Sequence, residues 1–169
     1  MKKRLILILL TVATVVALLF LLGTTANADA YGDFTYTDNV DGTATVTGYT
    51  GEGGYVEIFS SFGGKTVTAI GDEAFANNSV ITSISIPASV TSIGDSVFKN
   101  CSNLESITVL PANDDYTSES GVLYNKDKTT LICYPSKKTG SHFTVPSTVT
   151  GISEYAFQYC ESLRSIQIP

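Results

Sequence analysis

TVTAIGDEAFANNSVITSISI, residues 66–86, recurs further along the chain. The stretch SVTSIGDSVFKNCSNLESITV, residues 89–109, lies 23 residues later and is identical at ten of 21 positions. A third copy, TVTGISEYAFQYCESLRSIQI at residues 148–168, matches the second copy at eight of 21 positions. A period in the low twenties is typical of a solenoid, in which each unit buries its apolar face only against its neighbours. We therefore expect function to lie on an extended surface.

Each copy predicts two short extended segments joined by a turn. Ile84-Ser-Ile86 alternates apolar and polar residues with period two, which predicts a half-buried strand. Pro87 ends this strand, because proline donates nothing to a ladder. Residues 90–93 predict the second segment, and residues 72–77 predict one helical or 3₁₀ turn with an acidic start. The expected core residues recur at equivalent positions: Val67, Ile70, Phe75, Ile81, Ile84 and Ile86; Val90, Ile93, Phe98, Leu104, Ile107 and Val109; Val149, Ile152, Phe157, Leu163, Ile166 and Ile168.

These motifs resemble a known repeat. IGDEAF at 70–75, SIGDSVFKNCSNLESI at 92–107 and ISEYAFQYCESLRSIQIP at 152–169 resemble the repeat of the BspA-like leucine-rich repeat proteins. Residues 116–146 also resemble an irregular repeat common in that family. The resemblance covers most of residues 33–169. It implies a mainly β leucine-rich-repeat solenoid with short helical or 3₁₀ turns, in an exported bacterial surface protein associated with adhesion and protein binding. It implies no catalytic residues.

The chain divides into three parts. Residues 1–30 read as a secretory signal peptide, with Lys2, Lys3 and Arg4 before an apolar run and two A-x-A sites after it. The apolar run spans 18 residues, so an uncleaved N-terminal anchor is the alternative. Residues 31–61 predict an N-terminal β-hairpin cap, in which Asp41-Gly42 favours a type I′ turn. Residues 62–169 predict the array.

Three further expectations concern the array. Gly71 and Gly94 are expected at a bend that requires positive φ. An irregular repeat spans 112–148, and its two predicted strands are either an inserted hairpin or a widened repeat. The last strand is followed only by Pro169, so we expect further repeats, a cap or pairing of chains at this end.

Composition argues against several partners. Removing residues 1–30, which hold three basic residues and one acidic residue, changes the net charge from −6 to −8. Nucleic acid is disfavoured, because phosphate binding needs clustered Lys and Arg, and no membrane contact beyond the N-terminal segment is expected. Cys101 and Cys160 occupy one repeat position, where the first copy has Asn78, and we expect buried structural thiols there. None of the three cysteines, Cys133 included, sits in a C-x-x-C pair, so zinc is not expected. No other metal or cofactor is predicted.

The sequence predicts a non-catalytic binding or adhesion surface for a protein or glycan, displayed at or beyond the cell surface. His142 is expected to be exposed and to have no catalytic role, because no catalytic motif surrounds it. Repeats that serve as a structural spacer of a larger surface protein are the alternative, and an exported hydrolase is a second alternative without a supporting residue. Strand alternation assigns one outward stripe to the surface: Ser83, Ser85, Ser106, Thr108, His142, Thr144, Ser165 and Gln167.

Overall fold

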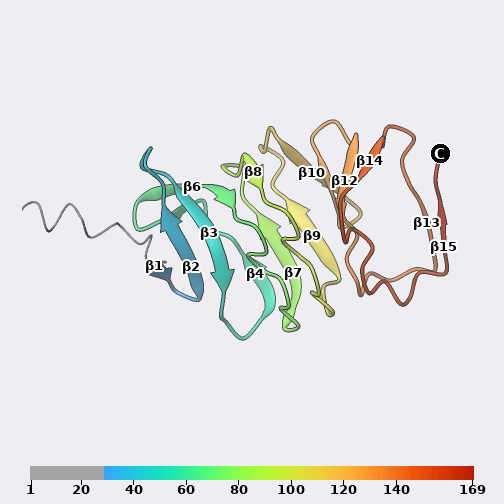
Figure 1. Ribbon diagram of the computed structural model, residues 1–169, viewed down its shortest axis with the longest axis horizontal. Coiled ribbons are helices and arrows are strands. Elements are labelled where there is room, and N and C mark those ends of the chain that lie inside the picture. The colour runs from blue at the N-terminus through green and yellow to red at the C-terminus, as the bar shows by residue number, and fades with distance from the viewer. Residues whose placement is uncertain (1–28) are drawn as a thin grey trace, which may run out of the picture.

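The computed structural model describes residues 29–169, which form fifteen strands and no helix. The strands stack along one long axis, from β1 and β2 at one end to β13 and β15 at the other (Figure 1). The predicted signal segment lies outside the described residues, apart from Asp29 and Ala30. Within residues 29–169 there is no helix that is long and apolar enough to cross a membrane. The predicted mainly β solenoid is confirmed.

The N-terminal sheet joins a hairpin to the first repeat. Strands β1 (Asp29–Tyr31), β2 (Phe34–Asp38) and β3 (Ala44–Tyr49) pair antiparallel, as the hairpin prediction required. β3 then pairs in parallel with β6 (Lys65–Ile70), which pairs in parallel with β8 (Ser92–Ile93) and antiparallel with the short β5 (Ser61–Phe62). The hairpin therefore covers the first turn of the array.

The turn of this hairpin differs from the predicted type I′. The Asn39 N–H donates to the Thr43 carbonyl at 2.9 Å, so the loop spans five residues. Only Gly42 is left-handed, with φ of +83°, whereas a type I′ turn requires positive φ at both central residues. The Asp41 carboxylate instead accepts a hydrogen bond from the Thr43 N–H at 3.0 Å. This side-chain bond favours the longer loop.

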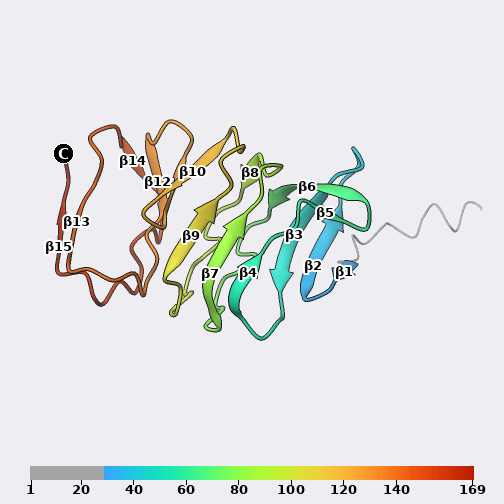
Figure 2. The same ribbon diagram turned by 180° about the vertical axis from the view of Figure 1, so that it is seen from behind.

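A second ladder consists of β4 (Gly54–Glu57), β7 (Ile81–Ile86) and β9 (Ser106–Val109), all parallel (Figures 1 and 2). β7 and β9 are the predicted repeat strands, in the predicted register of 23 residues. β4 precedes them and lies within the segment predicted as the cap. The ladder therefore begins one strand earlier than the recognisable repeats.

The predicted helical turn is a run of β-turns. In the first copy the N–H groups of Ala74, Ala76 and Asn78 each donate to the carbonyl three residues earlier. Glu73 and Asn77 have φ of 55° and 62°, which interrupts any helix. Left-handed residues recur at the equivalent positions of the other copies, Ser96, Asn100, Tyr155 and Tyr159.

The two repeat glycines are not at the left-handed positions, so that prediction was wrong. A Cβ on Gly94 would lie 2.5 Å from the Asp72 backbone nitrogen and 2.8 Å from the Gly71 carbonyl carbon. Gly94 is therefore required by close approach of two backbones, and Gly71, where a Cβ would meet the Val46 carbonyl oxygen at 3.2 Å, is less constrained.

The irregular segment is a widened repeat. β10 (Tyr116–Glu119), β11 (Val122–Asn125) and β12 (Thr130–Cys133) form an antiparallel meander, and β12 pairs in parallel with β14 (Gly151–Ile152). β12 thus occupies the place that β6 occupies beside β8. β13 (His142–Thr144) and β15 (Ser165–Gln167) form a separate parallel pair.

The core is divided, and its burial declines toward the C-terminal end. All six expected core residues of the first copy are buried, with exposed fractions of 1% or less. Phe98 and Phe157 are only partly buried, contrary to their prediction as full core residues. Ile152, Ile166 and Ile168 are 44%, 39% and 62% exposed, so the prediction fails for these three residues of the third copy, against which no further turn packs among residues 29–169. A smaller second cluster forms around Tyr124, Leu131 and Tyr134.

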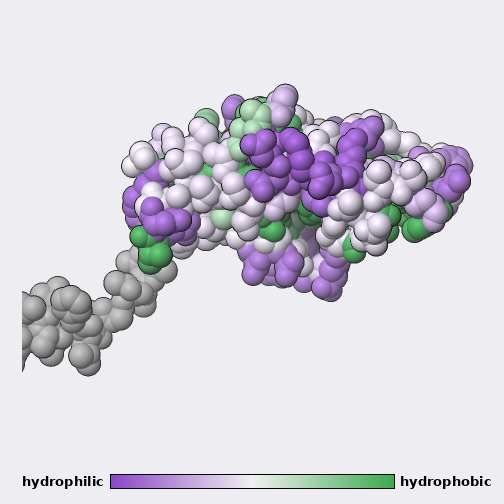
Figure 3. Space-filling model, turned by 90° about the horizontal axis from the view of Figure 1, so that it is seen from above, coloured by the Kyte–Doolittle hydropathy of each residue, from purple (hydrophilic) through white to green (hydrophobic). Residues whose placement is uncertain are grey.

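Seen from above, the molecule presents mainly hydrophilic and neutral residues, with hydrophobic ones in scattered small areas (Figure 3). Most of the buried apolar side chains form the two core clusters. Exposed apolar clusters are informative where they do occur.

Candidate binding surface

The predicted outward residues lie in two separate groups. On β7 and β9, Ser83 is the neighbour of Ser106, and Ser85 is the neighbour of Thr108. On β13 and β15, His142 and Thr144 pair with the remaining two, Ser165 and Gln167. The two strand pairs belong to different sheets. The structure therefore does not bring the eight residues together into one stripe, because the widened repeat separates the pairs.

Ser85 is not on the surface, which corrects its prediction. Its exposed fraction is 4%. It lies in the middle strand of the ladder, between Glu57 of β4 and Thr108 of β9. A small side chain flanked by two longer ones is covered by them, although it points to the outer face.

The first group extends onto β4, which the sequence analysis missed. Tyr55 is the neighbour of Ser83, and Glu57 is the neighbour of Ser85. Tyr55 is 63% exposed, whereas Val56 and Ile58 are buried at 3% and 2%. Polar and apolar residues alternate over 55–58, which could have predicted a half-buried strand there. The segment lacks the other positions of the repeat motif, so it was not recognised. We call Tyr55, Glu57, Ser83, Ser106 and Thr108 the outer row.

An aromatic cleft adjoins the outer row. It has a volume of about 370 Å³ and is lined by Tyr55 and Glu57 together with residues of the N-terminal hairpin. Tyr31 and Phe59, which are 44% and 48% exposed, pack edge to face there with ring centroids 6.2 Å apart. Asp33 adds a second carboxylate. Aromatic faces beside carboxylates can stack on a sugar ring or hold a cation, and aromatic residues are enriched at binding hot spots.

His142 is exposed, as predicted. Its Nδ1 lies 2.8 Å from the hydroxyl of the adjacent Ser141. Among residues 29–169, no group of three or more His, Cys, Asp or Glu side chains is placed to hold a metal ion.

The three thiols are free. Cys101 is buried, as predicted, whereas Cys160 is only partly buried, which corrects its prediction as a buried thiol. The Cys101 Sγ donates to the Phe75 carbonyl at 3.0 Å, and Cys160 Sγ contacts the Tyr134 carbonyl at 3.6 Å. In the first copy, the Asn78 carboxamide oxygen instead accepts from two backbone N–H groups. Burial raises the pKa of Cys101 and of Cys160 to about 11, and raises that of Cys133 well above its usual range. Nucleophilic thiolates are therefore disfavoured at neutral pH.

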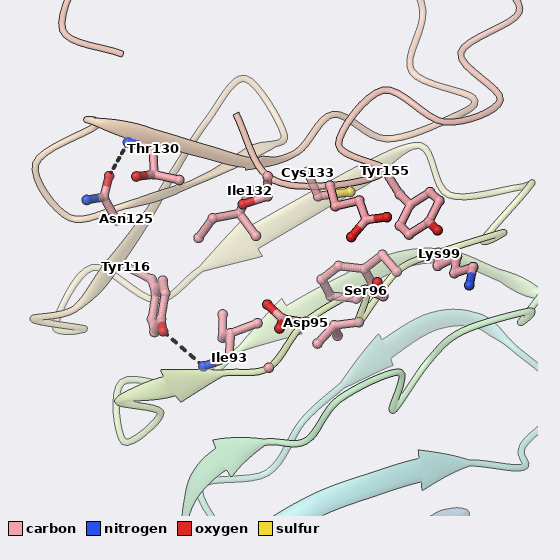
Figure 4. A pocket seen from close by; sticks show the side chains of 15 residues that line it. Ile93, Asp95, Ser96, Lys99, Tyr116, Asn125, Thr130, Ile132, Cys133 and Tyr155 are labelled. Carbon is pink, nitrogen blue, oxygen red and sulfur yellow. Dashed lines mark hydrogen bonds between the residues drawn. The ribbon is translucent and has the colours of Figure 1, made fainter. Parts of the chain in front are cut away.

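A second cleft of about 260 Å³ opens where the widened repeat meets the second copy. Asp95, Ser96 and Lys99 lie on one wall, and Ile132, Cys133 and Tyr155 lie on the other (Figure 4). Lys99 is held over the Tyr155 ring, with Nζ 4.7 Å from the centroid, and lies 3.5 Å from the Glu73 carboxylate. Its ammonium group is therefore already paired.

The stacked strands and turns correspond to a repeat that is also recognised in the sequence by a family model. The model, described as the BspA type leucine-rich repeat region, matches residues 60–140 and 132–169, in six copies. The chain belongs to the BspA-type leucine-rich repeat family. Strands β6 to β9 lie within the matched residues of that BspA-type repeat, whereas β4 precedes them.

Solved structures share the BspA-type fold. A leucine-rich repeat protein from Eubacterium ventriosum is 25% identical with a TM-score of 0.57, over 83% of this chain and 59% of that chain. A leucine rich cell surface protein from Faecalibacterium prausnitzii is 25% identical with a TM-score of 0.54, over 84% and 42%. A leucine-rich repeat protein from Bacteroides ovatus is 27% identical with a TM-score of 0.54, over 83% and 41%. This BspA-type chain thus spans 41–59% of these relatives. No curated protein matches the sequence.

Proposed function

We propose that the chain is a non-catalytic binding module of an exported, cell-surface protein, and that the outer row and the aromatic cleft contact a protein or glycan partner. The family is one of bacterial surface proteins, and one solved relative is described as a cell surface protein. Membership of a repeat family that is typically non-catalytic supports a binding role.

The observation that carries this proposal is the position of Tyr55. It projects from an edge strand of the ladder, with 63% of its surface exposed, between small polar side chains on one side and the aromatic cleft on the other. The predicted stripe by itself offered only small polar residues. The outer row adds the aromatic anchor and acidic group that such a surface needs for specific contact.

Replacement of this anchor tests the proposal. The chain from Asp29 onward would be screened against an array of oligosaccharides and a panel of immobilised extracellular proteins. We expect Tyr55→Ala to weaken any saturable interaction by about tenfold or more, because losing a hot-spot aromatic costs at least 1–2 kcal/mol. Val40→Ala is the matched control, since Val40 is fully exposed at the tip of the hairpin loop. Binding that is unchanged in Tyr55→Ala would contradict the assignment of the outer row, and absence of binding would favour a structural spacer.

Export is tested separately. Asp29 and Ala30 pair with Tyr36 and Thr35 in the hairpin. Signal cleavage after Ala28 preserves both pairs, whereas cleavage after Ala30 removes them. We therefore expect N-terminal sequencing of the secreted protein to start at Asp29. A mature chain that starts at Met1 would indicate an N-terminal anchor.

A further inference from the structure

Successive turns of the solenoid are joined by main-chain hydrogen bonds. The N–H groups of Glu73 and Phe75 donate to the carbonyls of Asp95 and Val97 at 2.9 and 3.1 Å. Asn77 likewise donates to Lys99 at 2.8 Å. Every second residue of one turn thus bonds to the next copy. These bonds define what an adjacent segment must supply, namely carbonyl oxygens on alternate residues.

The same donors of the second copy lack these acceptors. The residues equivalent to Glu73, Phe75 and Asn77 are Ser96, Phe98 and Asn100. The Asn100 N–H donates to the Gln158 side-chain oxygen at 3.0 Å. The N–H groups of Ser96 and Phe98 have no acceptor among residues 29–169, and both residues line the 260 Å³ cleft.

A shortened turn explains the missing bonds. The Tyr134 N–H donates to the Ala156 carbonyl at 2.8 Å, as Phe75 does to Val97. The Ser153 N–H donates to the Leu131 carbonyl, as Gly94 does to Ile70. Four residues lie between Ile70 and Phe75, but only two lie between Leu131 and Tyr134. The widened repeat is therefore two residues too short at its turn to place carbonyls against Ser96 and Phe98.

We propose that this cleft binds an extended, basic peptide segment of a partner protein, whose carbonyl groups complete the interrupted ladder at Ser96 and Phe98. An extended segment presents carbonyls on alternate residues toward the same side, and main-chain bonds of this kind provide affinity in strand-addition complexes. This site is distinct from the outer row and does not depend on it.

The charges of the cleft favour a basic peptide over an anion. Asp95 and Glu154 both line it, and Glu154 belongs to the turn of the third copy. The one lysine in the lining, Lys99, is paired with Glu73 and Tyr155. Carboxylates on two walls repel an anion at the free N–H groups, but they suit a lysine or arginine side chain that flanks neutral carbonyls.

The first test uses amide hydrogen exchange of the chain without ligand. We expect the amides of Glu73 and Phe75 to be protected, and those of Ser96 and Phe98 to exchange at least tenfold faster. Equal protection of all four amides would overturn the proposal, because it would show that the second-copy donors already have acceptors.

The second test uses defined peptides. We expect the acetylated and amidated tetrapeptide Val-Lys-Val-Lys to shift the amide resonances of Ser96 and Phe98 and to slow their exchange, and we expect Val-Glu-Val-Glu to do neither. Glu154→Lys should weaken binding about fivefold, as expected for one surface charge pair, while Glu52→Lys outside the cleft should leave it unchanged. Shifts confined to other residues, or no shifts at millimolar peptide, would overturn the proposal.

Discussion

At the residue scale, the equivalent positions of the repeat do not have equivalent burial. Phe75 is 1% exposed and lies between the hairpin and the second copy, whereas Phe98 stacks on it with centroids 5.7 Å apart but also lines the interrupted cleft. The sequence predicts the same role for both, because it contains the same motif twice. The motif around Phe98 gives no sign of the shortened turn before Tyr134, which leaves one side of Phe98 open.

The two phenylalanines should therefore differ in their contribution to stability. We expect Phe75→Ala to lower the free energy of unfolding by about 3–5 kcal/mol, and Phe98→Ala to lower it by roughly half as much, because less apolar surface is lost. Denaturant unfolding of both variants checks this. An equal loss for the two would contradict the difference in burial.

Because of the buried thiols, the free energy of unfolding should fall as the pH rises above 9. Burial raises the pKa of Cys101 from 9.0 to about 11, so between these values the folded state holds a proton that the unfolded state releases. The stabilisation is complete below pH 9 and is lost as the pH rises through 11, by about 2–3 kcal/mol for this thiol. We expect Cys101→Ala to flatten the decline of the unfolding free energy over this range. Identical slopes for parent and variant would show that Cys101 does not contribute.

At the element scale, one asparagine ties the widened repeat to the regular array. Asn113 is fully buried, and its side-chain amide donates to the carbonyls of Pro87 and Val90 at 3.0 and 2.8 Å. Its side-chain oxygen accepts from the N–H groups of Asp115 and Tyr116 at 2.9 and 2.7 Å. The end of β7 is thereby fixed to the start of β10.

We expect Asn113→Ala to cost at least about 3 kcal/mol of unfolding free energy, because each buried group left without a partner costs roughly 1–3 kcal/mol. Asn103→Ala is the matched control, since Asn103 makes one exposed bond, to the Ser79 carbonyl. Its expected cost is below about 1 kcal/mol. Thermal or urea unfolding distinguishes the two, and equal losses would refute the structural role of Asn113.

The sequence predicted the strands better than the turns between them. Ile84-Ser-Ile86 contains its own alternation, so β7 and its equivalents could be found directly. The β-turns could not, because Glu73 gives no composition signal for positive φ, and an asparagine such as Asn77 tolerates positive φ without requiring it. The outer residues were placed on the correct strands, but Ser85 is covered by its neighbours and Tyr55 lies on a strand without a repeat motif. Neighbour packing and strand order are tertiary properties that a local pattern does not contain.

At the scale of the whole molecule, the two ends of the described array are covered to different extents. The hairpin covers the N-terminal side, whereas β15 pairs only with β13 among the described strands. Ile166 lines a cleft of about 370 Å³ with Phe157 and Leu163, and Ile168 is 62% exposed beyond it. A strand edge beside exposed apolar side chains is a template for association.

We expect the chain from Asp29 onward to associate through this end as its concentration rises, because pairing buries both the strand edge and the isoleucines. Sedimentation measurements over a concentration series check this. Ile168→Lys should shift the equilibrium toward monomer, while Val40→Lys on the hairpin loop should not. A parent chain that stays monomeric throughout would show that this edge is self-sufficient.

The main-chain bonds between turns have a consequence for how such genes change. The contacts from Glu73, Phe75 and Asn77 to the following copy use backbone groups, so they do not depend on side-chain chemistry, although the positive φ of Glu73 and Asn77 disfavours β-branched residues there. Duplication of a stretch of 23 codons would therefore add a repeat copy whose backbone can bond to the copies on either side. Deletion of one copy would bring together two copies that can still bond to each other. Copy number can drift by recombination while the outward residues diversify independently. The turn before Tyr134 is shorter by two residues and not by a whole unit, and a cleft opens beside it.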